Sequence, residues 1–294
     1  MSSDYPPNST GSLPSHQEAI LTAARAGDVP ALQQHLTALG IQSPSSPIEP
    51  TWSRLPTFTI VLVPPSGPPA TSTLLAAAII ARQPHSLSYL LTVFPDACIT
   101  ALLGTALSHP NLEIFKILYA HDPSICDHEF ESGETTLMMA CRDGGTGTEA
   151  AEVIEFLLEN GADANESGLG LTGPLIFAVR YGQPLSIVEA MVGRGARVWN
   201  GVILEAMRAW RLDAAKWFLE VCNITDTVEM LEWLRAEVEK CGDLGLSKAY
   251  ERRLEEEKEK EKEKTFARAQ KDGAADKQPK EKGFLARVKQ IMGQ

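Results

Sequence analysis

One stretch, residues 133–165, constrains the fold of this chain more than any other part of the sequence. It holds two short segments, 137–141 and 153–158, whose apolar residues recur at helical spacing. The small Ala140 allows the two predicted helices to approach closely, and Gly161 supplies the left-handed residue that commonly ends a helix. Because neither helix can bury its apolar side alone, the stretch predicts a helical pair that stacks on similar neighbours.

This stretch resembles an ankyrin repeat, whose pattern is roughly T-P-L-H-x-A, a turn, a second helix ending in L-L, and G-A-D-x-N. The matching residues are Thr135, Leu137, Ala140, Gly144, Leu157, Leu158, Gly161, Ala162, Asp163 and Asn165. Thr136 stands where the family prefers Pro, Met138 stands where it prefers His, and extra residues near 146–150 lengthen the turn. The resemblance implies an all-α solenoid of stacked helix-turn-helix repeats.

The same pattern recurs in degenerate form through residues 16–222. Its anchor alanines are Ala23, Ala78, Ala106, Ala140, Ala178 and Ala206, which lie 55, 28, 34, 38 and 28 residues apart. The first interval contains a Pro-rich insertion, residues 41–70, and the others scatter around the ankyrin period of about 33 residues. Trp210 replaces the usual turn glycine of the last repeat. We therefore expect a domain of about six degenerate ankyrin-like repeats.

The segments around these repeats differ from them in composition. We expect a disordered leader in residues 1–15, which are rich in Ser and Pro, and a C-terminal capping region in residues 223–250. Within that region, residues 227–246 are predicted to form one helix, with an apolar stripe of Val228, Leu231, Leu234 and Val238. Inside the insertion, residues 57–63 alternate and are β-branched, which fits either a strand of an ordered hairpin or a surface loop.

A charged tail follows the capping region, residues 251–294. Its first part places like charges four residues apart and opposite charges three apart, so we expect a solvated, fraying helix, then a disordered linker at 270–283. Residues 282–294 are basic and carry Phe284, Leu285, Val288, Ile291 and Met292 at helical spacing. Such a helix fits a partner groove or an anionic membrane, and equally a frayed tail or a helix folded back on the acidic body.

Charge and cysteine content exclude several classes of protein. Residues 1–250 contain 14 Lys and Arg against 28 Asp and Glu, and such an acidic body repels nucleic-acid phosphates. The five cysteines are widely spaced, as in reduced intracellular proteins, and the polar N-terminus does not resemble a secretory signal. The longest apolar run, residues 74–81, is far shorter than a membrane span. We therefore expect a protein of the cytoplasm, the nucleus or both.

No sequence motif predicts catalysis. The chain lacks a glycine-rich phosphate loop, a nucleophile elbow and a metal-binding helix motif. The best metal candidate is a loop that offers His121, Asp122, Cys126, Asp127, His128 and Glu129, but its spacing fits no standard zinc site and we interpret it as a polar loop. Cys141 lies on a predicted core face. We therefore expect no enzyme activity, no cofactor and no metal.

The resemblance implies a protein-binding surface on the concave side of the stack. The residues it places on the first helices are Arg25, Arg142, Asp143, Arg180, Tyr181 and Arg208, and those on the turn fingers are Glu131, Glu134, Glu166 and Trp199. Tyr, Trp and Arg are the residue types that most often anchor interfaces. The alternative is that Trp199 packs against the next repeat and that the arginines only solvate the surface.

We therefore expect a monomeric, non-catalytic adaptor that binds another protein through this face, and the acidic body favours a partner with basic patches. A second hypothesis is a regulatory subunit or peripheral membrane adaptor that is targeted by residues 282–294, the one segment that we expect to contact a membrane. A third, an enzyme, lacks any supporting motif. The identity of the partner does not follow from a repeat scaffold.

Overall fold

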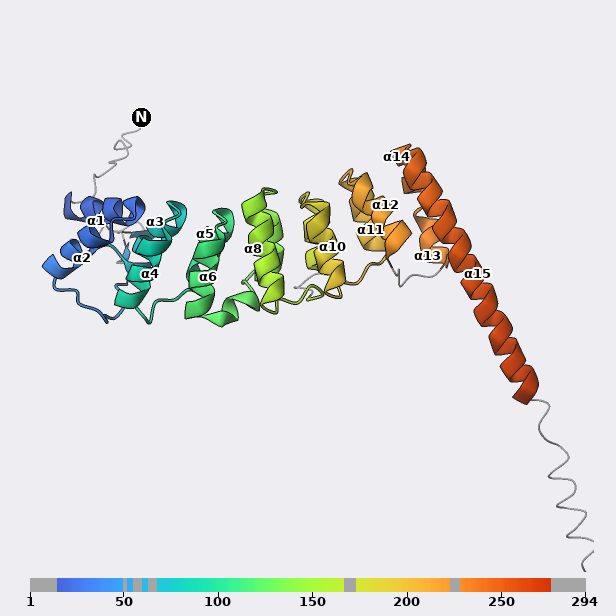
Figure 1. The fold of residues 1–294 in the computed structure, drawn as a ribbon, viewed down its shortest axis with the longest axis horizontal. Coiled ribbons are helices and arrows are strands. Elements are labelled where there is room, and N and C mark those ends of the chain that lie inside the picture. Colours follow the sequence, from blue (N-terminus) through green and yellow to red (C-terminus); the bar gives the residue numbers. More distant parts are fainter. Residues whose placement is uncertain are drawn as a thin grey trace, which may run out of the picture. The chain divides into compact units, whose positions relative to one another are not determined.

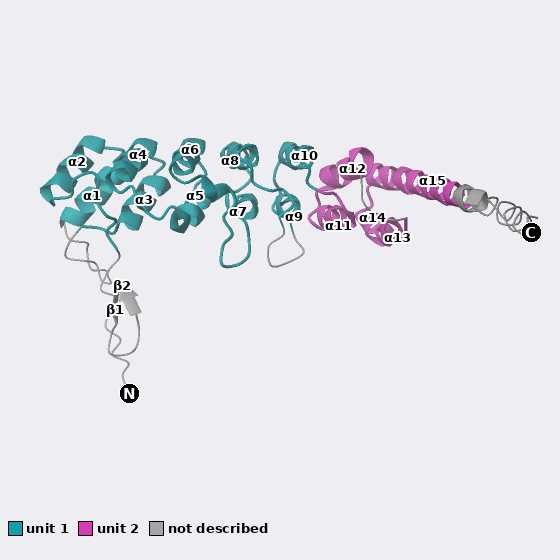
Figure 2. Ribbon diagram, turned by 90° about the horizontal axis from the view of Figure 1, so that it is seen from below, with its two compact units in different colours: residues 1–196 teal, residues 197–294 magenta. Residues whose placement is uncertain are grey.

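The structure is a computed structural model, and it describes residues 15–49, 52–54, 60–62, 68–166, 173–222 and 228–275. The predicted leader, apart from Ser15, and the basic segment 282–294 lie outside the described residues. The chain divides into two compact units, Met1–Ala196 and Arg197–Gln294, which are coloured separately in Figure 2. No helix within the described ranges is both long and apolar enough to cross a membrane.

The described part of the first unit contains five helical pairs. They are α1 (Ser15–Ala26) with α2 (Val29–Ala38), α3 (Thr71–Ile80) with α4 (Pro84–Val93), α5 (Leu103–Ser108) with α6 (Leu112–His121), α7 (Thr136–Asp143) with α8 (Thr148–Glu159), and α9 (Pro174–Arg180) with α10 (Leu185–Gly193). Two short 3-10 helices, η1 (Thr100–Leu102) and η2 (Pro123–Cys126), lie between pairs. These pairs confirm the first five predicted repeats.

The pairs stack as two rows of helices. The odd-numbered helices α1 to α9 contact one another in sequence and form the first row, and α2 to α10 form the second (Figures 1 and 2). The predicted anchor alanines, such as Ala78 and Ala140, are buried between the rows, where a small side chain lets the backbones approach. Polar side chains cap several helices: Asp28 accepts a hydrogen bond from the Ala31 amide at 2.9 Å, and Asn111 accepts one from Ile114 at 3.1 Å.

Four of the five pairs in the first unit turn through a left-handed residue four or five positions after the anchor alanine, whereas the α5–α6 turn, which contains Pro110, has none. Gly27 and Gly182 occupy the fourth position with φ of 75° and 76°. Arg82 takes the same conformation with φ 55°, although it has a side chain. In α7–α8 the left-handed residue comes one position later, at Gly145, because the turn is longer there. The left-handed turn therefore forms with or without glycine.

The Pro-rich insertion contains a short antiparallel pair, β1 (Trp52–Arg54) and β2 (Ile60–Leu62), with Trp52 opposite Leu62. Of the two interpretations of residues 57–63, the strand of a hairpin agrees with β2 at Ile60–Leu62. The first flank of the insertion is held to the second helical pair: the Ile48 amide donates to Thr71 Oγ1 at 2.8 Å, and the Thr71 amide donates to the Ile48 carbonyl at 2.9 Å.

The second unit contains α11 (Asn200–Arg208), α12 (Leu212–Val221), α13 (Val228–Trp233), α14 (Arg235–Cys241) and α15 (Leu244–Ala275). The first two form the expected sixth pair, with Trp210 left-handed at φ 55° in its turn. The single helix predicted for 227–246 is wrong. It breaks after α13, and again at Gly242, whose left-handed φ of 63° ends α14. The predicted stripe still packs, because Leu231, Leu234 and Val238 are buried.

The helix α15 is longer and more regular than the sequence predicts. Its first half packs against α12, α13 and α14 through Leu246, Tyr250 and Leu254, which are buried. Burial of this half supplies the nucleus that an isolated charged helix lacks, so the helix continues to Ala275 and the predicted linker is wrong for residues 270–275. From residue 259 to residue 269 every side chain is exposed.

Candidate partner-binding surface

The fingers are the loops that precede the first helix of a pair, and two fingers of the first unit carry described candidate residues. The first, residues 127–135, leads into α7, and the second, residues 163–166, follows α8. In the first finger the Glu129–Thr135 bridge closes the loop, and Gly133 makes the tight turn with φ 76°. Thr135 then caps α7 by accepting a hydrogen bond from the Met138 amide at 3.3 Å.

Three predicted site residues come together beside this finger. Arg142, near the end of α7, donates from Nη1 to Glu134 and from Nε to Asp143 at 2.8 Å. All three side chains are less than one third exposed. The hydrogen bonds to Asp143, and then to Glu134, raise the pKa of the guanidinium above its usual value. Arg142 therefore ties the finger to its helix, a role that the sequence does not reveal.

Acidic side chains of the two fingers gather into one patch, which we call the acidic finger patch: Asp127, Glu129, Asp163 and Glu166. Glu166 is half-buried and the other three are exposed. Burial, together with the charges of Asp163, Asp127 and Glu129, raises the pKa of the Glu166 carboxyl. The predicted Glu131 lies exposed at the tip of the first finger. The sequence indicates Glu166 as a binding residue but not its three neighbours, since only the fold brings the two fingers together.

The remaining candidates of the first unit lie at the ends of first-row helices. Arg25 reaches Glu18 on the same helix at 3.4 Å, and both side chains are about half exposed. Arg180 is exposed at the end of α9, and Tyr181 is 39% exposed with its ring 5.8 Å from that of Phe177. These three side chains therefore lie at the surface, and none of them belongs to the acidic finger patch.

One further arginine at a first-row turn was missed. Arg82 donates from Nη1 to Glu149 Oε1 at 2.7 Å and so links the second pair to the fourth. Arg82 stands four residues after Ala78, at a position where glycine is usual, and this departure from the pattern could have indicated it from the sequence.

Two candidates belong to the second unit. Trp199 caps α11 at 38% exposure, and its indole lies so close to Gly201 that any side chain there would collide with the ring. Trp199 thus packs on the first turn of α11. Arg208 ends α11 with its Nε 3.9 Å from Glu237 Oε1 on α14.

The cysteines and polar loops offer little for chemistry. Cys141 is fully buried, which raises the pKa of its thiol, and burial raises that of Cys126 to about 11. Cys98 is exposed, and a hydrogen bond with Thr100 lowers its pKa. Within the described ranges, including the loop 121–129, no three His, Cys, Asp or Glu side chains are placed to share a metal ion.

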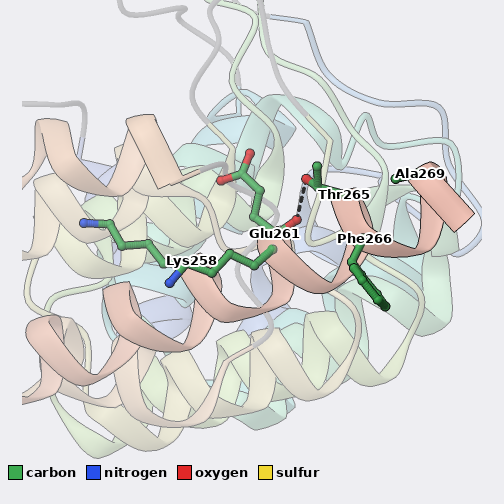
Figure 3. Close-up of a pocket in the computed structure, with 6 residues that line it drawn as sticks. Lys258, Glu261, Thr265, Phe266 and Ala269 are labelled. Atoms are coloured by element: carbon green, nitrogen blue, oxygen red, sulfur yellow. Dashed lines mark hydrogen bonds between the residues drawn. The ribbon is translucent and has the colours of Figure 1, made fainter.

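A groove of about 550 Å³ runs along α15 (Figure 3). Its described lining consists of Lys258, Glu261, Lys262, Thr265, Phe266 and Ala269. The Thr265 hydroxyl donates to the Glu261 carbonyl at 2.8 Å, as the dashed line in Figure 3 marks. Since these residues all belong to one helix, the groove has no second described wall and no converging polar groups that would orient a small molecule.

Comparison with known proteins agrees with this architecture. The family model for ankyrin repeats in three copies matches residues 74–168 and 103–202. This match identifies residues 74–202 as ankyrin repeats. Ankyrin repeats generally act as protein–protein interaction modules, and the matched segments include both fingers.

A crystal structure of the ankyrin repeat domain of Bcl-3, described as a unique member of the IkappaB protein family, is also similar. The identity is 21%, the match covers 67% of this chain and 83% of that chain, and the TM-score is 0.46. A likeness of this degree carries no argument about partners. No curated protein matches the chain.

Proposed function

We propose that this ankyrin-repeat protein is a non-catalytic adaptor that binds a basic segment of another protein through its acidic finger patch and the neighbouring first-row helices. The observation that carries the proposal is the grouping of four carboxylates, Asp127, Glu129, Asp163 and Glu166, on two neighbouring fingers. Like charges held close together repel one another, and a cationic partner would relieve this repulsion. In this proposal the protein is a monomer without enzyme activity, and it acts in the cytoplasm, the nucleus or both.

The composition of the chain supports a cationic partner. Residues 1–250 are strongly acidic, so their electrostatic field attracts basic segments of a partner before contact. The candidate surface also offers an exposed aromatic side chain, Tyr181, and exposed Arg180, which are types that anchor interfaces. Arg142 supports the surface indirectly, because it holds the first finger against α7.

The test is affinity capture from native lysate with quantitative mass spectrometry. The full chain is compared with a finger variant, Glu129→Lys with Glu166→Lys, and with a control, Glu152→Lys with Glu155→Lys, on the exposed side of α8. Both variants change the net charge equally. We expect basic partners to be lost from the finger variant and kept by the control. Retention of the same partners by the finger variant, or equal loss from both variants, contradicts the proposal.

A further inference from the structure

The short helix α13 is packed on one side and bare on the other. Leu231 is fully buried, and its carbonyl accepts a hydrogen bond from the Tyr250 hydroxyl of α15 at 3.1 Å. Met230 and Trp233, three residues apart and therefore on one side of the helix, are 47% and 61% exposed. We call these two side chains the Met230/Trp233 face. Single exposed apolar residues are common, but two large ones on adjacent turns suit a ligand.

The surroundings of this face are acidic. Glu229 and Glu232 lie next to Met230 and Trp233 in sequence and are exposed. Glu232 pairs with Lys258 of α15 at 2.8 Å. Residues 226–239 hold five acidic side chains against Arg235 as the one base, and the Arg235 guanidinium stacks over the Tyr250 ring. The face therefore suits a ligand that combines apolar side chains with positive charge.

The chain itself carries such a ligand beyond the described residues. Residues 282–294 combine three bases, Lys282, Arg287 and Lys289, with five apolar side chains at helical spacing. We propose that residues 282–294 bind the Met230/Trp233 face of the same chain. This surface belongs to the second unit and is separate from the acidic finger patch.

The length of the intervening chain allows this contact. Helix α13 packs against α15 (Figure 1). An ion pair between Glu232 and Lys258 joins the two helices. From Lys258 to Ala275 the helix rises about 26 Å, at 1.5 Å per residue. The nine peptide steps from Ala275 to Phe284 span at most about 31 Å. The chain can therefore run back along α15 far enough to bring Phe284 level with Trp233. The apolar residues that follow Phe284 can then lie along α13.

Hydrogen exchange with mass spectrometry on the full chain tests the proposal in both directions. Leu285→Asp with Ile291→Asp should speed the exchange of amides in residues 228–241 several-fold, because α13 loses its cover. Conversely, Trp233→Ser with Met230→Ser should speed exchange in residues 282–294. Combining both pairs should add little to either, since they remove the same contact. Phe266→Ser, which changes another exposed aromatic of the second unit, is the control and should leave both segments unchanged.

The tail variant, Leu285→Asp with Ile291→Asp, cannot unfold the packed units. The test therefore stays decisive even if the α13 variant, Trp233→Ser with Met230→Ser, loses helix. Exchange in residues 228–241 that is identical with and without the two tail aspartates overturns the proposal. A protection that disappears on tenfold dilution shows binding to a second copy, which also overturns it. Binding of the wild-type chain to vesicles containing phosphatidylserine, with α13 exchange unaffected by the tail variant, assigns the segment to membranes and refutes the contact.

Discussion

At the scale of single residues, Trp210 is the clearest departure from the repeat pattern. It holds a left-handed φ of 55° at the turn where Gly27 and Gly182 stand in other pairs, and it is 69% exposed. A residue with a side chain costs roughly 1–2 kcal/mol in this conformation. Because the indole buries little surface, packing does not offset that cost.

We therefore predict that Trp210→Gly stabilises the protein by about 1 kcal/mol. Urea unfolding followed by circular dichroism measures the change. Ala209→Gly is the matched control, because Ala209 has an ordinary φ of −79° and glycine there should lower stability instead. A lower midpoint for Trp210→Gly would mean that the indole makes stabilising contacts that its exposure does not suggest.

Glu166 is the second residue whose environment makes a prediction. Its pKa is raised in the folded protein by burial and by neighbouring carboxylates, so the ionised form costs stability above that pKa, and the cost vanishes once Glu166 is protonated at lower pH. Glu166→Gln should therefore raise the melting temperature at pH 7. The gain should shrink as the pH falls through the usual range of a glutamate.

Calorimetry at several pH values measures this effect. Glu131→Gln, in the exposed tip of the same finger, controls for the loss of one negative charge. An equal gain from both variants would assign the effect to net charge rather than to the environment of Glu166.

At the scale of elements, adjacent turns are joined by a buried amide. Gln183 is fully buried, and its Nε2 donates to the carbonyls of Cys141 and Gly145, both at 2.8 Å. These two hydrogen bonds join the α7–α8 turn to the α9–α10 turn. Gln183→Leu should destabilise the protein by about 2 kcal/mol, because the carbonyl of the buried Cys141 loses its donor. Chemical denaturation measures the loss, and Gln34→Leu on the exposed side of α2 should change stability by less than about 0.5 kcal/mol.

The finger beside α7 makes a further prediction at this scale. Arg142→Glu places a third carboxylate next to Glu134 and Asp143, so it should destabilise the protein by about 1 kcal/mol. Hydrogen exchange in residues 129–135 should become faster, whereas exchange in α8 should stay unchanged. Unaltered exchange in the finger would show that the bridge between Glu129 and Thr135 alone holds the loop.

The sequence predicted the elements well where a local pattern recurs. The anchor alanines and the apolar stripes located six helical pairs, because helical periodicity is a local property. The region after α12 was predicted less well: the stripe from Leu231 to Val238 was correct, but the breaks at Leu234 and Gly242 were not seen. Those breaks let α13 and α14 each pack on α15, a tertiary requirement that periodicity does not contain.

The candidate surface was predictable only in part, for a similar reason. The repeat pattern places Glu134 on a finger and Arg142 on a helix, but their pairing depends on how the loop folds back. Likewise, Asp127 and Glu166 are far apart in sequence, and they interact only because consecutive repeats stack.

At the scale of the whole molecule, charge is distributed unevenly along the chain. Residues 1–250 have twice as many acidic as basic side chains, whereas residues 251–294 have 13 basic against 10 acidic. A partner that binds the acidic finger patch is thus attracted by the patch and by the field of the body together. Both attractions act between exposed charges, and salt screens them over about 10 Å at 0.1 M and about 3 Å at 1 M.

We therefore predict that capture of the proposed basic partner weakens strongly as salt rises from about 0.1 M to about 1 M, mainly through slower association. The folded core should change little over that range, because its stability rests on buried apolar side chains such as Leu137 and Ile154. Association rates from biosensor traces, with circular dichroism at each salt concentration, separate the two effects. Affinity that stays constant or rises with salt would indicate an apolar interface, and would move the binding surface away from the fingers to exposed aromatic side chains such as Tyr181.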